Sequence, residues 1–225
     1  MRPVVIIGAG SQARETLEIL DACRGADPRS GQVVLGFIVD EEYRAQGSQL
    51  GEKPILGGFE WLEQNAARID VICAIGAPHL RYRLAQRAKS MGAQFCSAIH
   101  PTAVISRSAT FGSGCIIAAQ AVLSCHVVLG EHVLVNLACT VSHDSVLQDF
   151  VSAAPGVHIA GRVSVGTGCL LGIGSAVTPD RRIGEWSLVG AGSAVTADLP
   201  DNCTAVGVPA RVIKRRPADW HLTAS

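Results

Sequence analysis

Aromatic side chains and charges are scarce in this chain of 225 residues. Phe, Trp and Tyr make up 4% of it, charged residues make up 17%, and 19 basic residues balance 19 acidic ones. The absence of net charge and the pI near 7.0 give no reason to expect nucleic acid or an anionic membrane surface as a partner. We therefore expect neither of these partners.

Long apolar runs and paired cysteines are missing as well. No segment reaches the ~18 apolar residues of a membrane span, and the N-terminus, MRPVVIIGAGSQ, does not read as a secretory signal. The eight cysteines contain no C-x-x-C pair, which argues against a zinc ribbon or a redox motif. They are most simply small core residues in a reducing compartment, so we expect a cytoplasmic protein without a metal site.

The first part of the chain, residues 1–97, alternates strand-like and helix-like segments. The patterns predict helices at 11–23, 57–65 and 79–92, and strands at 3–10, 32–40, 69–76 and 94–99. Such alternation predicts an α/β, Rossmann-like domain with a parallel sheet and right-handed crossovers.

From Ile99 onward, an apolar residue recurs at every sixth position. All 17 positions of this series, which ends at Val195, are apolar, and the position four residues later is small or Val in 15 of 16 cases. A fixed six-residue period is typical of a parallel β-helix, in which three hexads form one 18-residue coil of a triangular prism. We predict a β-helix over residues 98–216 and a C-terminal tail at 217–225.

A glycine-rich loop, GAGSQA at residues 8–13, joins the first predicted strand to the first predicted helix. Glycines allow close approach to a pyrophosphate, and the helix N-terminus offers it N–H groups. Asp40 and Glu41 end the second strand, where a carboxylate can meet a ribose. The loop fits a nucleotide sugar, NAD or a turn without ligand; NAD fits poorly, because the domain is about half a classical dinucleotide fold.

The pair His143-Asp144 follows the inward-facing Val141 at a predicted corner of the prism. An imidazole suits the role of general base near neutral pH, and a neighbouring carboxylate stabilises its protonated form. Adjacent residues need not touch, so a solvated corner pair is the alternative interpretation.

Together these segments resemble the left-handed β-helix (hexapeptide-repeat) acyltransferases. AVGVPARVI at 205–213 is similar to their terminal signature. VVIIGAGSQARE, AIHPTAVIS and SHDSVLQDF resemble bacterial nucleotide-amino-sugar N-acetyltransferases, which are grouped with the sialic-acid O-acetyltransferase-like proteins. The resemblance covers nearly the whole chain and implies a homotrimer that binds acetyl-CoA between adjacent β-helices.

The resemblance also implies roles for particular residues. His143 would be the general base with Asp144 as its partner, and the substrate-binding residues would be Gly8, Gly10, Ser11, Gln12, Asp40, Glu41 and Gly76. Acetyl-CoA would meet Ser152, Gly161, Ile173 and Ala191, with a backbone N–H near Gly161 as an oxyanion donor. Relatives commonly carry Gly-His in place of Ser11-Gln12 and often a histidine in place of Ser152. The basic run at 214–216 would either pair with CoA phosphates or form a solvated tail.

The predicted function is acetyl-CoA-dependent N-acetylation of the 4-amino group of a UDP- or other NDP-linked amino-deoxysugar, for surface glycan biosynthesis. O-acetylation of a sialic acid is the nearest alternative, because the same base serves a hydroxyl group. A γ-carbonic-anhydrase-like metalloenzyme is disfavoured, since no two histidines are spaced as H-x-x-x-x-H. A non-catalytic scaffold is the remaining alternative.

Overall fold

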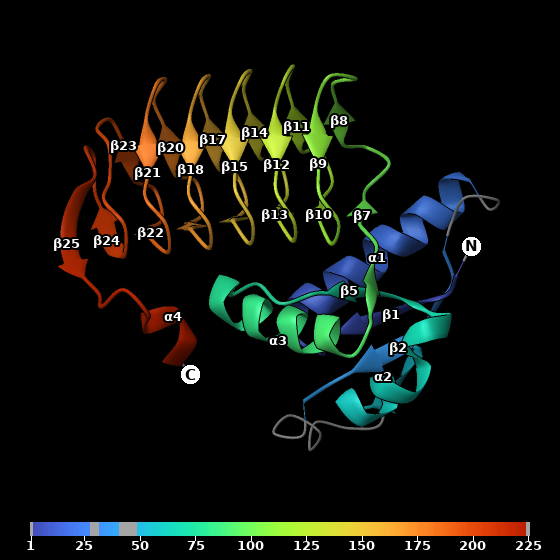
Figure 1. The fold of residues 1–225 in the computed structure, drawn as a ribbon. Coiled ribbons are helices and arrows are strands. Elements are labelled where there is room, and N and C mark those ends of the chain that lie inside the picture. The colour runs from blue at the N-terminus through green and yellow to red at the C-terminus, as the bar shows by residue number, and fades with distance from the viewer. Residues whose placement is uncertain (1, 28–31, 41–48, 224–225) are drawn as a thin grey trace.

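The computed structural model describes residues 2–27, 32–40 and 49–223, which form an α/β domain followed by a long prism of short strands (Figure 1). The α/β domain has one six-stranded sheet in the order β3-β4-β2-β1-β5-β6, parallel throughout except for the pair β3 and β4. Its strands are β1 (Val4–Ile7), β2 (Val34–Ile38), β3 (Gln49–Leu50), β4 (Lys53–Gly57), β5 (Asp70–Cys73) and β6 (Gln94–Phe95). Its helices are α1 (Ser11–Ala26), α2 (Phe59–Asn65) and α3 (Pro78–Ser90), with a 3-10 turn at Ala66–Arg68.

The alternation of strands and helices predicted for this domain is confirmed, with two differences. The hairpin of β3 and β4 was not predicted, because Pro54 and the nearby glycines resemble a loop. The predicted strand at 94–99 is wrong as a single element: Gln94–Phe95 closes the α/β sheet, whereas β7 (Ala98–Ile99) begins the prism. The chain thus changes from one sheet to another within two residues.

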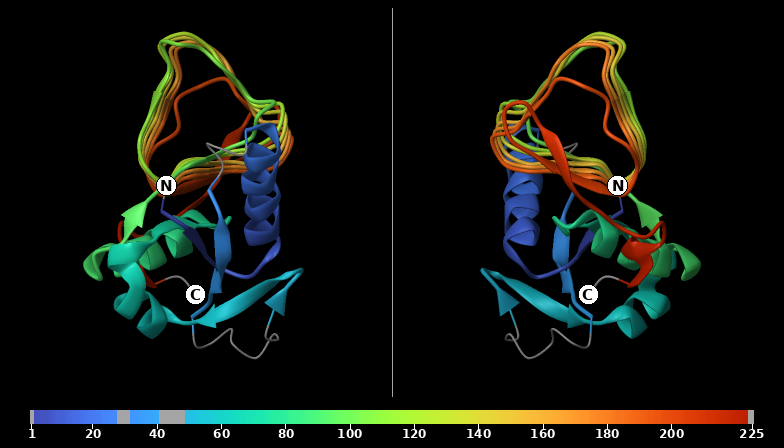
Figure 2. Two further views of the ribbon diagram at one scale, coloured as in Figure 1. Left: turned by 90° about the vertical axis from the view of Figure 1, so that its right-hand side faces the viewer. Right: turned by 90° about the vertical axis from the view of Figure 1, so that its left-hand side faces the viewer.

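The prism is a β-helix with three faces, each a sheet of parallel strands, as predicted from the six-residue period (Figure 2). It has the left hand that the family resemblance implied. The first face contains β7, β10 (Ile116–Ile117), β13 (Leu134–Val135), β16 (Ser152–Ala153), β19 (Leu170–Leu171), β22 (Leu188–Val189) and β24 (Cys203–Val206), with β25 (Arg211–Arg215) antiparallel at its end. The second face contains β8 (Val104–Ile105), β11 (Val122–Leu123), β14 (Thr140–Val141), β17 (His158–Ile159), β20 (Ala176–Val177) and β23 (Ala194–Val195). The third face contains β9 (Thr110–Phe111), β12 (Val128–Leu129), β15 (Val146–Leu147), β18 (Ser164–Val165) and β21 (Arg182–Ile183).

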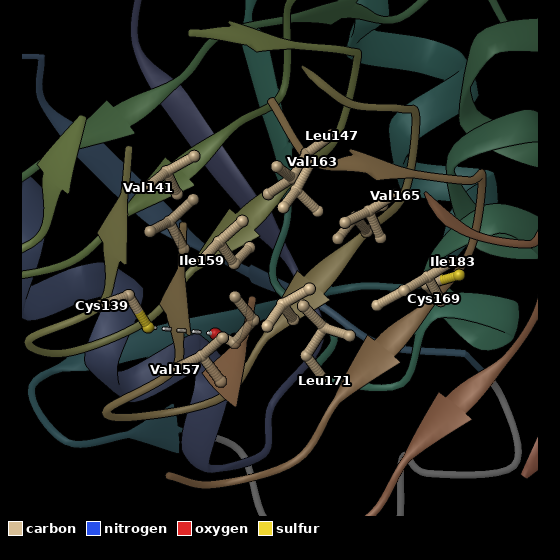
Figure 3. Close-up of a cluster of buried hydrophobic side chains, with 14 of the residues drawn as sticks. Cys139, Val141, Leu147, Val157, Ile159, Val163, Val165, Cys169, Leu171 and Ile183 are labelled. Carbon is tan, nitrogen blue, oxygen red and sulfur yellow. Dashed lines mark hydrogen bonds between the residues drawn. The ribbon is translucent and has the colours of Figure 1, made fainter. Parts of the chain in front are cut away.

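The inward-facing residues fill the prism with one continuous apolar core (Figure 3). Val141 pairs with Ile159 in the next coil, so each residue lies against the one 18 positions later. Phe111, in the first coil, is 39% exposed, because no earlier coil covers that end of the prism. Burial of this apolar core removes a large apolar surface from water and supplies the main stabilisation of the β-helix.

The α/β domain rests on the first face of the prism. One apolar cluster joins α1 and the sheet to Ala98, Ile116 and Leu134, and a second joins α2, α3 and the opposite side of the sheet to Phe150. The predicted tail folds back as α4 (Trp220–Thr223) beside α3. There His221 stacks on Trp186 at a centroid distance of 3.8 Å. The two domains therefore share buried apolar surface.

Candidate active site

His143 and Asp144 form the turn between β14 and β15, on the edge that joins the second and third faces of the prism. We call this edge the His143 edge. Asp144 has a left-handed backbone conformation, with φ of 59°, which a short polar residue adopts at modest cost. Its carboxylate oxygen Oδ2 lies 2.8 Å from Nδ1 of His143. The two neighbours, whose contact the sequence left open, therefore touch.

A second histidine reaches the same carboxylate from the preceding coil. Nδ1 of His126 lies 3.3 Å from Oδ1 of Asp144, because the two residues are 18 positions apart. In the following coils Arg162 and Asp180 form a bidentate ion pair, with N–O distances of 2.6 and 2.9 Å. His126 was not predicted, although stepping back 18 residues from Asp144 identifies it.

These hydrogen bonds determine the charge and tautomer of the pair. The hydrogen bond from His143, and secondarily that from His126, lowers the pKa of the Asp144 carboxyl below its usual value. An ionised carboxylate only accepts hydrogen bonds, so Nδ1 of His143 carries a proton. In the neutral ring Nε2 then has a free lone pair, which is the form that a general base requires.

Gly161 lies against the ring of His143 from the next coil. A Cβ added to Gly161 would stand 2.5 Å from Cε1 and 2.6 Å from Nε2 of His143, far inside van der Waals contact. The glycine is therefore needed at this position to leave room for the imidazole. The His143 side chain remains 45% exposed, so its ring is supported on one side and accessible to a ligand.

The other residues predicted to bind acetyl-CoA do not lie on the His143 edge. Ile173 and Ala191 are exposed and stack one coil apart on the edge that joins the first and second faces, which we call the Ile173 edge. Ser152 is 2% exposed on β16 and its hydroxyl donates to the carbonyl of Gly76 at 3.0 Å. A contact between Ser152 and an acetyl group would require this buried hydrogen bond to break, so the structure places Ser152 in the domain interface.

The glycine-rich loop borders a pocket of about 360 Å³ in the α/β domain. Gly8 and Gly10 line it, together with Asp40 and three residues that the sequence did not indicate, Leu80, Arg83 and Leu84. Gly8 has φ of +111°, and a Cβ there would stand 2.7 Å from Cδ1 of Ile75, so only glycine fits. Gly10 is the N-cap of α1, whose first turn has no side-chain cap and therefore has N–H groups available for an anion.

The remaining predicted substrate residues are distributed around this pocket. Asp40 forms an ion pair with Arg87 at 3.1 Å, which fixes its carboxylate at the rim, whereas Glu41 lies outside the described residues. Ser11 begins α1. Gln12 faces a second, smaller groove of about 190 Å³ between α1 and the prism, which also contains Asn136 and Leu137 on the Ile173 edge. Gln12 thus stands between the pocket and that edge.

The described residues contain neither a cluster of metal ligands nor a membrane-spanning helix. No group of three or more His, Cys, Asp or Glu side chains among them is arranged to hold a metal ion. No helix in these parts of the chain is long and apolar enough to cross a membrane.

Comparison with known proteins gives the family of the chain. The PglD N-terminal domain family matches residues 3–88. The GDP-perosamine N-acetyltransferase of Escherichia coli O157:H7 is 31% identical over 230 residues, which cover 94% of this chain and 96% of that enzyme. The similarity therefore extends over both domains.

Two solved structures have the same fold over nearly their whole length. One is a histidine-to-asparagine variant of perosamine N-acetyltransferase from Caulobacter crescentus in complex with CoA and GDP-perosamine. It is 33% identical with a TM-score of 0.86, covering 94% of this chain and 97% of that one. The other is the acetyltransferase domain of PglB from Neisseria gonorrhoeae FA1090 in complex with acetyl coenzyme A. It is 30% identical with a TM-score of 0.84, covering 94% of this chain and 99% of that one.

The fold and the His143 edge define the chain as a hexapeptide-repeat acyltransferase, an acetyl-CoA-dependent sugar N-acetyltransferase as the sequence predicted. It belongs to the family of nucleotide-sugar N-acetyltransferases that join a PglD N-terminal domain to a left-handed β-helix.

Proposed function

We propose that this enzyme transfers the acetyl group of acetyl-CoA to the 4-amino group of a nucleotide-linked amino-deoxysugar such as GDP-perosamine. The amine nitrogen attacks the thioester carbonyl, the new C–N bond forms, and the C–S bond then breaks to release CoA. Nε2 of His143 accepts the proton that the amine loses. The acceptor is the one named for the perosamine enzymes that this chain resembles over 94% of its length, and the donor is the ligand named for the PglB acetyltransferase domain.

The observation that carries the proposal is the hydrogen bond between Nδ1 of His143 and Asp144. It holds the imidazole in the tautomer that accepts a proton at Nε2, and the ionised carboxylate stabilises the imidazolium that forms. Gly161 keeps the ring in place from the next coil. A backbone N–H near Gly161 is our candidate donor to the oxyanion of the tetrahedral intermediate.

The pocket beside the glycine-rich loop is our candidate site for the nucleotide. The N-terminus of α1 at Gly10 favours a diphosphate, and Arg83 on α3 adds a positive charge to the same pocket. Asp40, held by Arg87, is a candidate contact for the nucleoside. The sugar would then extend past Ser11 and Gln12 towards the groove beside the Ile173 edge.

Acetyl-CoA is proposed to bind between two chains. His143 and Gly161 lie on one edge of the prism, whereas Ile173 and Ala191 lie on another, so one prism cannot bring all four to one ligand. Two β-helices side by side place the His143 edge of one against the Ile173 edge of the next. A closed ring of three such contacts is a homotrimer, with an active site in each groove.

We expect the reaction to take place in the cytoplasm and to supply surface glycan biosynthesis. The cysteines support this location, because all eight are free and a reducing compartment keeps thiols in that form.

The decisive assay follows CoA thiol release with GDP- and UDP-linked 4-amino sugars and with free sialic acid. We expect turnover with a nucleotide-linked amine, and a loss in His143→Ala of at least about 10²-fold. His158→Ala is the matched control, because it removes an exposed imidazole that bonds Thr140 on the second face. Unchanged turnover in His143→Ala would contradict the assignment of the base, and turnover with sialic acid alone would contradict the acceptor class.

A further inference from the structure

Arg81 on α3 is a charged side chain at the centre of the domain interface. It is 1% exposed, and burial lowers its pKa to about 10. Within the described parts of the chain no carboxylate forms an ion pair with it, although buried cations ordinarily require one. An apolar side chain would fill this buried space more favourably than a charged one. Arg81 must therefore have a role other than packing.

The guanidinium group of Arg81 joins the two domains through backbone oxygens. On the prism side, Nε donates to the carbonyl of His132 at 3.0 Å and Nη2 donates to that of Phe150 at 2.9 Å. On the side of the α/β domain, Nη1 donates to the carbonyls of Ile75 and Gly76. All three nitrogens are used, and the planar fork of arginine is what allows one residue to do this.

Ser152 completes the same network from β16. Its hydroxyl accepts a hydrogen bond from Nη2 of Arg81 at 2.8 Å and donates one to the carbonyl of Gly76 at 3.0 Å. Gly76 is therefore held twice, once by a residue of α3 and once by a residue of the prism. This gives Ser152 a defined role in the contact between the two domains.

The segment fixed in this way belongs to the nucleotide pocket. Ile75, which precedes Gly76 and accepts from Arg81, lines that pocket and packs against Gly8. The wall of the pocket is consequently tied by hydrogen bonds to two successive coils of the β-helix, through His132 in one and through Phe150 and Ser152 in the next. These hydrogen bonds therefore determine the distance between the nucleotide pocket and the catalytic prism.

We propose that Arg81, with Ser152, is a positioning residue for acetyl transfer that holds the Gly76 edge of the nucleotide pocket at a fixed place against the β-helix. A sugar tethered through its nucleotide then presents its amine at a constant distance from the acetyl group. Displacement by about 1 Å from such a geometry lowers a rate by about 10²-fold. The inference rests on the proposed function, since it needs an acceptor that is anchored in the α/β domain.

The test compares Arg81→Lys and Ser152→Ala with the control Lys89→Met. Lys89 is also on α3 and also reaches the prism, through an exposed ion pair with Glu131 at 3.8 Å, which contributes little. For each variant, circular dichroism measures folding, and calorimetry measures the dissociation constants of CoA and of GDP or UDP separately. Steady-state CoA release gives kcat per folded chain.

We expect Arg81→Lys to bind both ligands within about threefold of wild type while kcat falls at least about tenfold. Ser152→Ala should lose about threefold in kcat, and Lys89→Met should match wild type. If Arg81→Lys does not fold, the Ser152→Ala result decides.

Unchanged kcat in Ser152→Ala and in any folded Arg81→Lys would overturn the inference while the proposed function stands. Equal losses of kcat and of both affinities would show a merely structural role. Absence of turnover in the wild type with every nucleotide-linked amine would remove the proposed function and this inference with it.

Discussion

Adding one methyl group at Gly161 should disable the enzyme without removing any catalytic group. In Gly161→Ala the new Cβ would stand 2.5 Å from Cε1 of His143, whereas ordinary contacts begin at 3.4 Å. The ring must therefore move by almost 1 Å, which disturbs its 2.8 Å hydrogen bond to Asp144. A misplacement of this size predicts a loss of about 10²-fold in kcat.

The fold should tolerate the same substitution. Gly161 does not have a left-handed backbone conformation, so alanine introduces no backbone strain there, and we expect a change in Tm of at most a few degrees. Gly25→Ala is the matched control, because a Cβ at Gly25 meets no atom within 4 Å. The measurement is CoA release at saturating acetyl-CoA, with Tm by calorimetry. Activity of Gly161→Ala within about twofold of the control would refute this assignment of His143 as the base.

Four further predictions follow from the same geometry. Asp144→Asn keeps the shape of the pair and removes its charge, so kcat should fall by about 10-fold or more across neutral pH; a pH–rate profile identical to wild type would contradict this. His132 is buried, and burial lowers its pKa to about 4. Between about pH 6.5 and 4 its imidazole is therefore protonated in the unfolded chain and neutral in the folded chain. Stability should therefore be full above about pH 6.5 and fall by about 3 kcal/mol as the pH drops to about 4. Urea unfolding should show that loss in wild type and not in His132→Asn. Gly8→Ala should weaken GDP binding by at least about tenfold and leave CoA binding unchanged in calorimetry; equal binding of GDP would show that the pocket lies elsewhere. Finally, His143→Ala and Ile173→Glu should each be inactive alone, and co-refolding the two should restore activity. In the proposed trimer, some mixed grooves join the intact His143 edge of the Ile173→Glu chain to the intact Ile173 edge of the His143→Ala chain; no recovery would place the site within one chain.

The β-helix could be predicted from the sequence because its contacts are periodic. Each inward residue, such as Val141, touches the one 18 positions later, so a six-residue pattern determines both the side of the prism and the register. The hairpin of β3 and β4 has no such pattern, and Pro54 within it disfavours a strand. Gln94–Phe95 and Ala98–Ile99 belong to one strand-like segment in the sequence, and only the packing of two domains divides it.

The candidate site was predictable where it follows the coil repeat and not where it depends on domain packing. His143 and Asp144 were predicted at a corner, and counting one coil further back would have added His126. Arg81 lies in a helix with many basic residues, and nothing in that pattern distinguishes the one that is buried. Its partner Ser152 was assigned to acetyl-CoA because of its position relative to the base, whereas the structure gives it the carbonyl of Gly76.

The most direct test of the proposed reaction is the chemical identity of the product. Purified enzyme, acetyl-CoA and GDP-perosamine should yield a nucleotide sugar that is heavier by one acetyl group, with that group on the 4-amino nitrogen by NMR. Because it is an amide, the product should resist hydroxylamine, and it should not form with His143→Ala. An acetyl group on a hydroxyl, released by hydroxylamine as an ester, or an unmodified nucleotide sugar would contradict the proposed reaction.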